Sequence, residues 1–140
     1  MQLDSLKKII RVIKAQENDL SFKLKSISNQ LDTLDEKILL WSDHLERIDT
    51  ELKNILLAGS EIGTVMYMIN QKKNLAEMLM MLHGQVNELN KEFDKIATEM
   101  KLERNKKRFV EKKIKEEEKV IAIEKEKKLE IELTERWLKF

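Results

Sequence analysis

Apolar residues recur along the first 55 residues in alternating steps of three and four. The series is Leu3, Leu6, Ile10, Ile13, Glu17, Leu20, Leu24, Ile27, Leu31, Leu34, Ile38, Trp41, Leu45, Ile48, Leu52 and Ile55, in which Glu17 alone is not apolar. A mean spacing of about 3.5 residues places these side chains on one seam of a helix that supercoils around a partner. The pattern therefore predicts a coiled-coil helix over about residues 2–57.

A second series with the same spacing starts ten residues after Ile55. It comprises Val65, Met68, Lys72, Leu75, Leu79, Leu82, Val86, Leu89, Phe93, Ile96 and Met100. Beyond Met100 the series continues as Glu103, Lys107, Val110, Ile114, Glu117, Ile121, Glu124, Lys128, Ile131, Glu135 and Leu138, and six of these eleven positions are charged. We therefore expect a second helix over about residues 64–138 whose seam weakens toward its C-terminal end.

The segment between the two series has the densest cluster of helix-ending residues in the chain. The sequence contains no Pro and three Gly, and Gly59 and Gly63 both fall here, with Ser60 between them. Gly59 suits a left-handed helix end, and Ser60 suits a cap of the next helix with Glu61 near its first turn. The segment 58–63 is therefore predicted to be a turn, and the alternative is one continuous, straight helix that absorbs the shift of phase by overwinding.

A reversal near residue 60 predicts the register of the two helices. Position i then lies opposite about 120 − i, so the residues from about 118 to 140 project beyond the N-terminus as a helical overhang. Glu17 falls near Glu103 in this register, with Arg104, Lys106 and Lys107 close by. It either forms a polar layer that fixes the register, paired with a neighbouring base, or marks a weakly closed end that can engage a partner. The predicted fold is all-α, a long antiparallel two-helix coiled-coil hairpin in a single domain over residues 1–140.

Composition argues against several classes of function. The 27 basic and 26 acidic residues give a net charge of +1, so nothing points to nucleic acid. The chain has no Cys and only two His, His44 and His83, which are too far apart for a metal site. We predict no cofactor, no catalytic residue and no enzymatic activity, because a helical hairpin offers no pocket for acid–base chemistry. Neither a signal peptide nor a membrane span is expected.

Methionine and aromatic residues supply the candidate contacts. Five of the seven Met fall within residues 66–81, and flexible Met side chains suit adaptable binding surfaces. This stretch is interpreted as a partner-binding patch, or alternatively as apolar residues that wrap the hairpin tip or pack a third helix. Trp41 is expected in the core, whereas Trp137 and Phe140 on the overhang are exposed for docking or belong to a frayed end. The basic residues around Arg104 and Arg108 suit an acidic protein surface or a solvated face.

The stretch GSEIGTVMYMINQKKNLAEML (59–79) and the run KLERNKKRFVEKKIKEEEKVIAIEKEKK (101–128) together resemble the FliJ/YscO/InvI family. These are central-stalk proteins of flagellar and virulence type III secretion ATPases. The resemblance spans nearly the whole chain but consists of pattern, without a short diagnostic motif. It implies a cytoplasmic protein, peripheral to the membrane apparatus, whose joined termini enter a hexameric secretion ATPase. The rest of the hairpin would contact the export gate protein and export chaperones.

The resemblance places gate contacts early in the second helix, around Met68, Leu75, Leu79 and His83. The full set of predicted partner-binding residues is Met66, Met68, Leu75, Met78, Leu79, His83, Arg104, Lys107, Arg108 and Trp137. The main alternative is a structural coiled-coil scaffold that self-associates, and a weak homodimer is compatible with either interpretation. A prefoldin-like clamp is disfavoured because residues 56–66 are too short for its β-hairpins. A membrane-surface helix is disfavoured because charges are too evenly mixed over residues 101–128.

Overall fold

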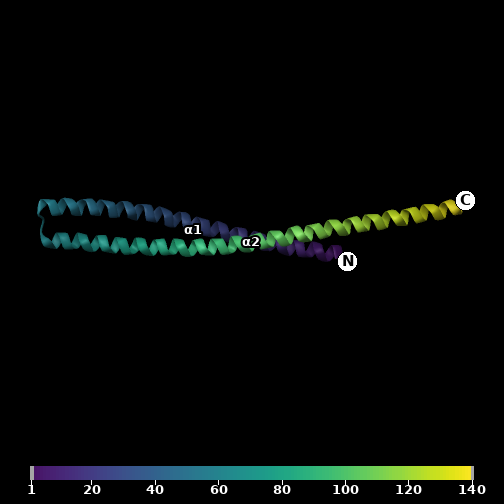
Figure 1. Cartoon of the computed structure of the whole chain (residues 1–140), viewed down its shortest axis with the longest axis horizontal. Helices are drawn as coiled ribbons and strands as arrows, with labels where there is room; N and C mark the ends of the chain where they lie inside the picture. The colour runs from purple at the N-terminus through teal and green to yellow at the C-terminus, as the bar shows by residue number, and fades with distance from the viewer. Residues whose placement is uncertain (1, 140) are drawn as a thin grey trace. The chain divides into compact units, whose positions relative to one another are not determined.

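The computed structural model describes residues 2–139 and consists of two helices. Helix α1 spans Gln2–Ala58 and helix α2 spans Ile62–Leu138, and a short turn joins them (Figure 1). No strand is present in the described part of the chain. The chain is thus an all-α hairpin of two long helices packed against each other, which confirms the fold class predicted from the two apolar series.

Gly59 ends α1 in the way its sequence context predicts. Its φ of +70° is a conformation that glycine adopts without steric cost. The Ser60 N–H donates to the Ile55 carbonyl at 3.2 Å, and the Gly59 N–H donates to the Leu56 carbonyl at 3.4 Å. This pair of bonds is a Schellman motif, which satisfies carbonyls that the end of the helix would leave unpaired. The left-handed residue reverses the chain direction.

Helix α2 begins at Ile62, two residues before the predicted start at about residue 64, and its cap lies one residue after the predicted one. The carbonyl of Glu61 accepts hydrogen bonds from the Thr64 and Val65 N–H groups at 3.1 and 3.2 Å, so Glu61 occupies the cap position. Ser60 had been expected there, with Glu61 inside the first turn. The Schellman motif accounts for the shift, because it engages the backbone N–H of Ser60 in ending α1. The turn therefore contains three residues, 59–61.

The fold divides into two compact units, and each contains a segment of both helices. The turn unit comprises residues 23–96. The terminal unit comprises the described residues of the two remaining segments, 2–22 and 97–139.

The turn unit is held together by the predicted seam. Its largest buried cluster contains Ile48, Leu52, Met68 and Leu75, against which Trp41, Leu45, Ile55 and Val65 pack. Every seam position from Leu24 to Ile55 and from Val65 to Ile96 is at least partly buried. Complete burial of an apolar side chain contributes about 1.5–3 kcal/mol, and the partly buried members contribute less. The hydrophobic seam, with Trp41 at its edge, is therefore the main source of stability in this unit.

The terminal unit has a smaller apolar core. Ile10, Ile13 and Val110 are buried, and Leu6 and Ile114 pack against them. Seam positions from Leu3 to Leu20 and from Met100 to Ile121 are at least partly buried. From Ala122 to Lys139 every residue is exposed, including the seam positions Ile131 and Leu138. Within this unit the C-terminal end of α2 thus extends past the N-terminal segment, as the unequal helix lengths predict (Figure 1).

Candidate functional site

Heptad positions sort the surface of each unit into two sides. The seam occupies positions a and d, with Leu3 and Val65 as a. In an antiparallel pair the g positions of the two helices face each other across one edge of the seam, with c outside them. The e positions face each other across the opposite edge, with b outside them. We call these the g/c side and the e/b side.

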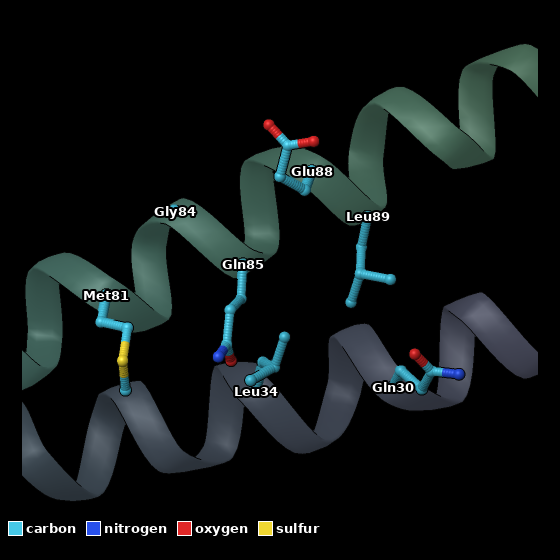
Figure 2. Close-up of a pocket in the computed structure, with 7 residues that line it drawn as sticks. All are labelled: Gln30, Leu34, Met81, Gly84, Gln85, Glu88 and Leu89. Carbon is cyan, nitrogen blue, oxygen red and sulfur yellow. The ribbon is translucent and has the colours of Figure 1, made fainter.

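The most pronounced hollow of the turn unit lies on its g/c side. This groove, with a volume of about 710 Å³, is lined by Gln30 and Leu34 of α1 and by Met81, Gly84, Gln85, Glu88 and Leu89 of α2. Figure 2 shows Met81, Gln85 and Leu89 pointing from α2 toward α1, whereas Glu88 points away. Gly84 contributes no side chain, and a Cβ built on it would meet nothing within 4 Å.

Exposed apolar residues border this groove. Met81 is 57% exposed and Met78 is 38% exposed, and both lie on the g/c side. Leu40 of α1 is 68% exposed on the same side, and a shallow hollow beside it is lined by Leu40, Trp41 and His44. The rings of Trp41 and His44 meet edge to face at a centroid distance of 6.2 Å. An open groove beside flexible apolar side chains suits an apolar side chain of a partner helix.

The predicted methionine patch does not form a single surface. Met66 and Met80 lie at b positions on the e/b side, with Ile69 and His83 at e positions, whereas Met78 and Met81 lie on the g/c side. Met68, Leu75 and Leu79 are buried against α1, at 8 to 9% exposure. A partner that approaches the closed hairpin therefore meets Met66, Met78 and His83 on two different sides. The prediction of one patch treated residues 66–81 as a single stretch, whereas their heptad positions separate the two sides.

Leu40, Gln30 and Gly84 were not predicted as site residues. Leu40 belongs to the first helix, far along the chain from the methionines. Its c position and the register of about 120 − i place it opposite position 80 of α2, on the same side as Met81. Applying the register to the flanking positions as well as to the seam would have found it.

A polar layer interrupts the core of the terminal unit. Lys107 Nζ lies 3.5 Å from Glu17 Oε2, and Lys106 Nζ lies 3.2 Å from Glu103 Oε1. Glu17 and Glu103 are 15% and 14% exposed at the side chain. The predicted pairing of Glu17 with a neighbouring base is confirmed, and Lys107, predicted as a partner contact, is engaged within the hairpin. Arg104 and Arg108 are exposed.

An ion pair also joins the two helices near the turn. Lys72 Nζ lies 2.6 Å from Asp49 Oδ1, and Lys53 lies 3.5 Å from Asp49 Oδ2 on the same helix. The hydrogen bond and the positive charge of Lys72 lower the pKa of Asp49 below its usual value of 3.8. Lys72, the one charged member of its seam up to Met100, thus pairs across the helices instead of remaining unpaired in the core.

The exposed end of α2 carries the remaining predicted contact. Trp137 is 80% exposed and Leu138 is 81% exposed, while Phe140 lies outside the described residues.

Among residues 2–139 no group of His, Cys, Asp and Glu side chains is arranged to hold a metal ion. None of the described helices has an apolar run long enough to cross a membrane.

Comparison with models of known protein families finds no match, and neither do comparisons with curated proteins and with solved structures.

Proposed function

We propose that this chain is a central-stalk protein of a type III secretion apparatus, of the FliJ/YscO/InvI kind, and acts without catalytic chemistry. The observation that carries the proposal is the C-terminal end of α2, where every residue from Ala122 to Lys139 is exposed. An isolated helix of this length is marginal in water, so it gains stability by packing against another chain. In the proposal this end, with the N-terminus beside it, enters the pore of a hexameric secretion ATPase.

Charge favours a partner with acidic side chains beside the paired part of the terminal unit. Residues 101–140 contain 14 basic and 10 acidic side chains, and the excess of four positive charges lies within residues 101–121, because residues 122–139 contain five of each sign. Arg104 and Arg108 are exposed on the paired part of the same unit. Their charges would steer the terminal unit toward acidic side chains and would make the association sensitive to salt.

The groove beside Gly84 is proposed to serve a second contact, with an export gate protein or an export chaperone. Its apolar lining and the neighbouring Met78 and Met81 suit a helical partner. A stalk needs two such contacts, one with the ATPase and one with the next component. The protein would then work at the cytoplasmic face of the secretion apparatus.

The test is ATP hydrolysis by a hexameric secretion ATPase with and without this chain. Deletion of residues 122–140 is expected to abolish stimulation, because it removes the exposed segment and leaves both buried clusters intact. The matched control is Met81→Lys, which alters the groove and is expected to leave stimulation unchanged while weakening capture of a gate fragment. Equal stimulation by the truncated and full-length chains would overturn the proposal.

A further inference from the structure

A line of exposed apolar residues follows the g/c side of the terminal unit. It contains Ile9, Val12, Leu102, Phe109, Val120, Ile123 and Trp137, exposed by 46 to 80%. On α1 the g and c positions of this unit are Gln2, Ser5, Ile9, Val12, Gln16 and Asp19, with one charge among six. The e and b positions Asp4, Lys7, Arg11, Lys14, Asn18 and Ser21 carry four. The side that would normally be solvated is thus partly apolar.

On α2 the g and c positions form a strip beside the first seam. Its positions are Lys106, Phe109, Lys113, Glu116, Val120, Ile123, Lys127, Glu130, Thr134 and Trp137, of which four are apolar and five are charged. The strip is on the order of 50 Å long, which is long enough to pack against another helix. Up to Ile121 the first seam of α2 is covered by α1, so a further helix that contacts this part of α2 packs beside the first seam.

We propose that the occupant is the same strip of a second copy of this chain, running antiparallel. The strip is self-complementary about a two-fold axis between residues 121 and 122, so that position i meets 243 − i. Val120 then meets Ile123 of the second copy, and symmetry repeats the contact, which gives two apolar layers at the axis. An isologous interface of this kind closes as a dimer.

The charges on either side of this centre are also complementary. Glu116 meets Lys127 of the second copy, and Lys113 meets Glu130, each twice. Lys113 already lies 3.5 Å from Glu116 on its own helix, so the four side chains form an alternating network on each side of the axis. Opposite charges at matched positions fix partner and register in coiled coils.

The outer layers fit the same register. Lys106 meets Trp137 of the second copy, a pairing of a cation with an exposed aromatic ring. Phe109, 63% exposed and with Lys113 Nζ 5.6 Å from its ring centroid, meets Thr134. Ile9 and Val12 border the same side from α1 and extend the apolar contact. The exposed end of each chain is then covered by the paired helices of the other.

The opposite side of α2 is less complementary. On the e/b side the same two-fold relation would bring Glu111 against Glu132 and Arg104 against Lys139, whereas Glu118 against Lys125 is its one pair of opposite charges at the e positions. Its apolar members between residues 101 and 139 are Ala122 and Leu129. Like charges in register are destabilising, so this side favours solvent. The difference in charge pairing and in apolar content between the two sides predicts that the dimer forms through the g/c side.

The dimer does not depend on the proposed stalk function. It would cover the segment proposed to enter the ATPase, so the two partners would compete for it. Failure of ATPase stimulation would leave the dimer untouched, and a monomeric chain could still bind the ATPase.

Sedimentation of the full chain over a range of concentrations tests the interface. We expect a monomer–dimer equilibrium, weakened at least about 100-fold by Val120→Glu, because each dimer loses two buried contacts. Leu129→Glu, an exposed apolar residue on the e/b side, is the matched control and is expected to leave the equilibrium unchanged. Circular dichroism verifies that both variants retain the hairpin. A chain that stays monomeric, or a dimer insensitive to Val120→Glu, would overturn the proposal.

Charge reversal tests the register, because a dimer held together by apolar contacts in another register would not respond to these charges in the same way. Glu116→Lys and Lys127→Glu each place like charges opposite one another and should weaken the homodimer about tenfold. Mixing the two variants should restore association, because the introduced lysine of one variant then meets the introduced glutamate of the other, and the natural pair forms at the second contact. If the mixture associates no better than either variant alone, this antiparallel register is wrong. If the strip binds a helix of a different protein and not a second copy of this chain, the proposed dimer is also wrong.

Discussion

The ammonium group of Lys107 on α2 lies 3.5 Å from the carboxylate of Glu17 on α1, across the seam of the terminal unit. The register of about 120 − i places Glu103 of α2 opposite Glu17, so two carboxylates occupy facing seam positions. Glu17 Oε1 and Glu103 Oε2 are buried and accept no hydrogen bond from the described residues. Such a layer lowers stability, since each buried oxygen without a hydrogen bond costs about 1–3 kcal/mol. The layer also disfavours other registers of the two helices, because in those registers the carboxylates would lie against apolar seam positions.

The first prediction is that replacing this layer stabilises the hairpin. Glu17→Leu combined with Glu103→Leu should raise the free energy of unfolding by about 1–3 kcal/mol, because two apolar side chains then fill a buried layer while Lys107, whose side chain is 29% exposed, extends its ammonium group to solvent. Urea unfolding measures the change. Glu118→Leu, at an exposed position of the same unit, is the control and should have little effect. A double variant that is less stable than the natural chain would contradict this view of the layer.

A second prediction concerns Asp49 and pH. The pKa of Asp49 is lowered by Lys72 in the folded chain, so the pair stabilises the fold above the unfolded value of about 3.8. This contribution disappears as pH falls through the folded pKa, where the carboxylate becomes protonated. Asp49→Asn should therefore be less stable than the natural chain at neutral pH, and the difference should vanish in acid. Thermal unfolding of both chains across pH measures this, with Asp32→Asn as the exposed control. A difference that persists in acid would rule out the ion pair as its cause.

Replacing glycine by alanine should change the free energy of unfolding in opposite directions at two positions. Gly84→Ala meets open space within a helix and should stabilise the chain by about 0.5–1 kcal/mol. Gly59→Ala forces a side chain into a backbone with φ of +70° and should destabilise it by about 1 kcal/mol. Denaturant midpoints of the two variants measure both effects. Stabilisation by Gly59→Ala would mean that the turn is not left-handed.

Hydrogen exchange should divide α2 into protected and unprotected parts. In dilute monomer, amides of residues 122–139 should exchange close to the rate of an unstructured chain, because this segment packs against nothing in the described hairpin. Amides around Leu75 and Leu79 in the turn unit should exchange slowest. Raising the protein concentration should protect residues 122–139 if the dimer forms. Strong protection of this segment in a verified monomer would show that it is held within its own chain.

Much of the fold follows from local sequence. The spacing of the series from Leu3 to Ile55 identifies the buried face of α1 because helix geometry is repetitive, so neighbours three and four residues apart share a face. Gly59 marks the reversal because few other residues tolerate its φ. The proximity of Glu17 and Lys107 could also be predicted, since the position of the reversal determines which residues of the second helix lie opposite those of the first.

The tertiary structure decided what lies beside the seam. Met78 and Met81 lie close in sequence to Met66 and Met80, yet the two pairs lie on opposite sides of the turn unit. Leu40 joins the first pair although it belongs to the other helix. Which residues make a common surface depends on the side from which the second helix approaches, and that is a relation between chain segments rather than a property of either one. For the same reason the sequence by itself determined the two helices and their buried faces, whereas the groove beside Gly84 emerged only when the helices were packed together.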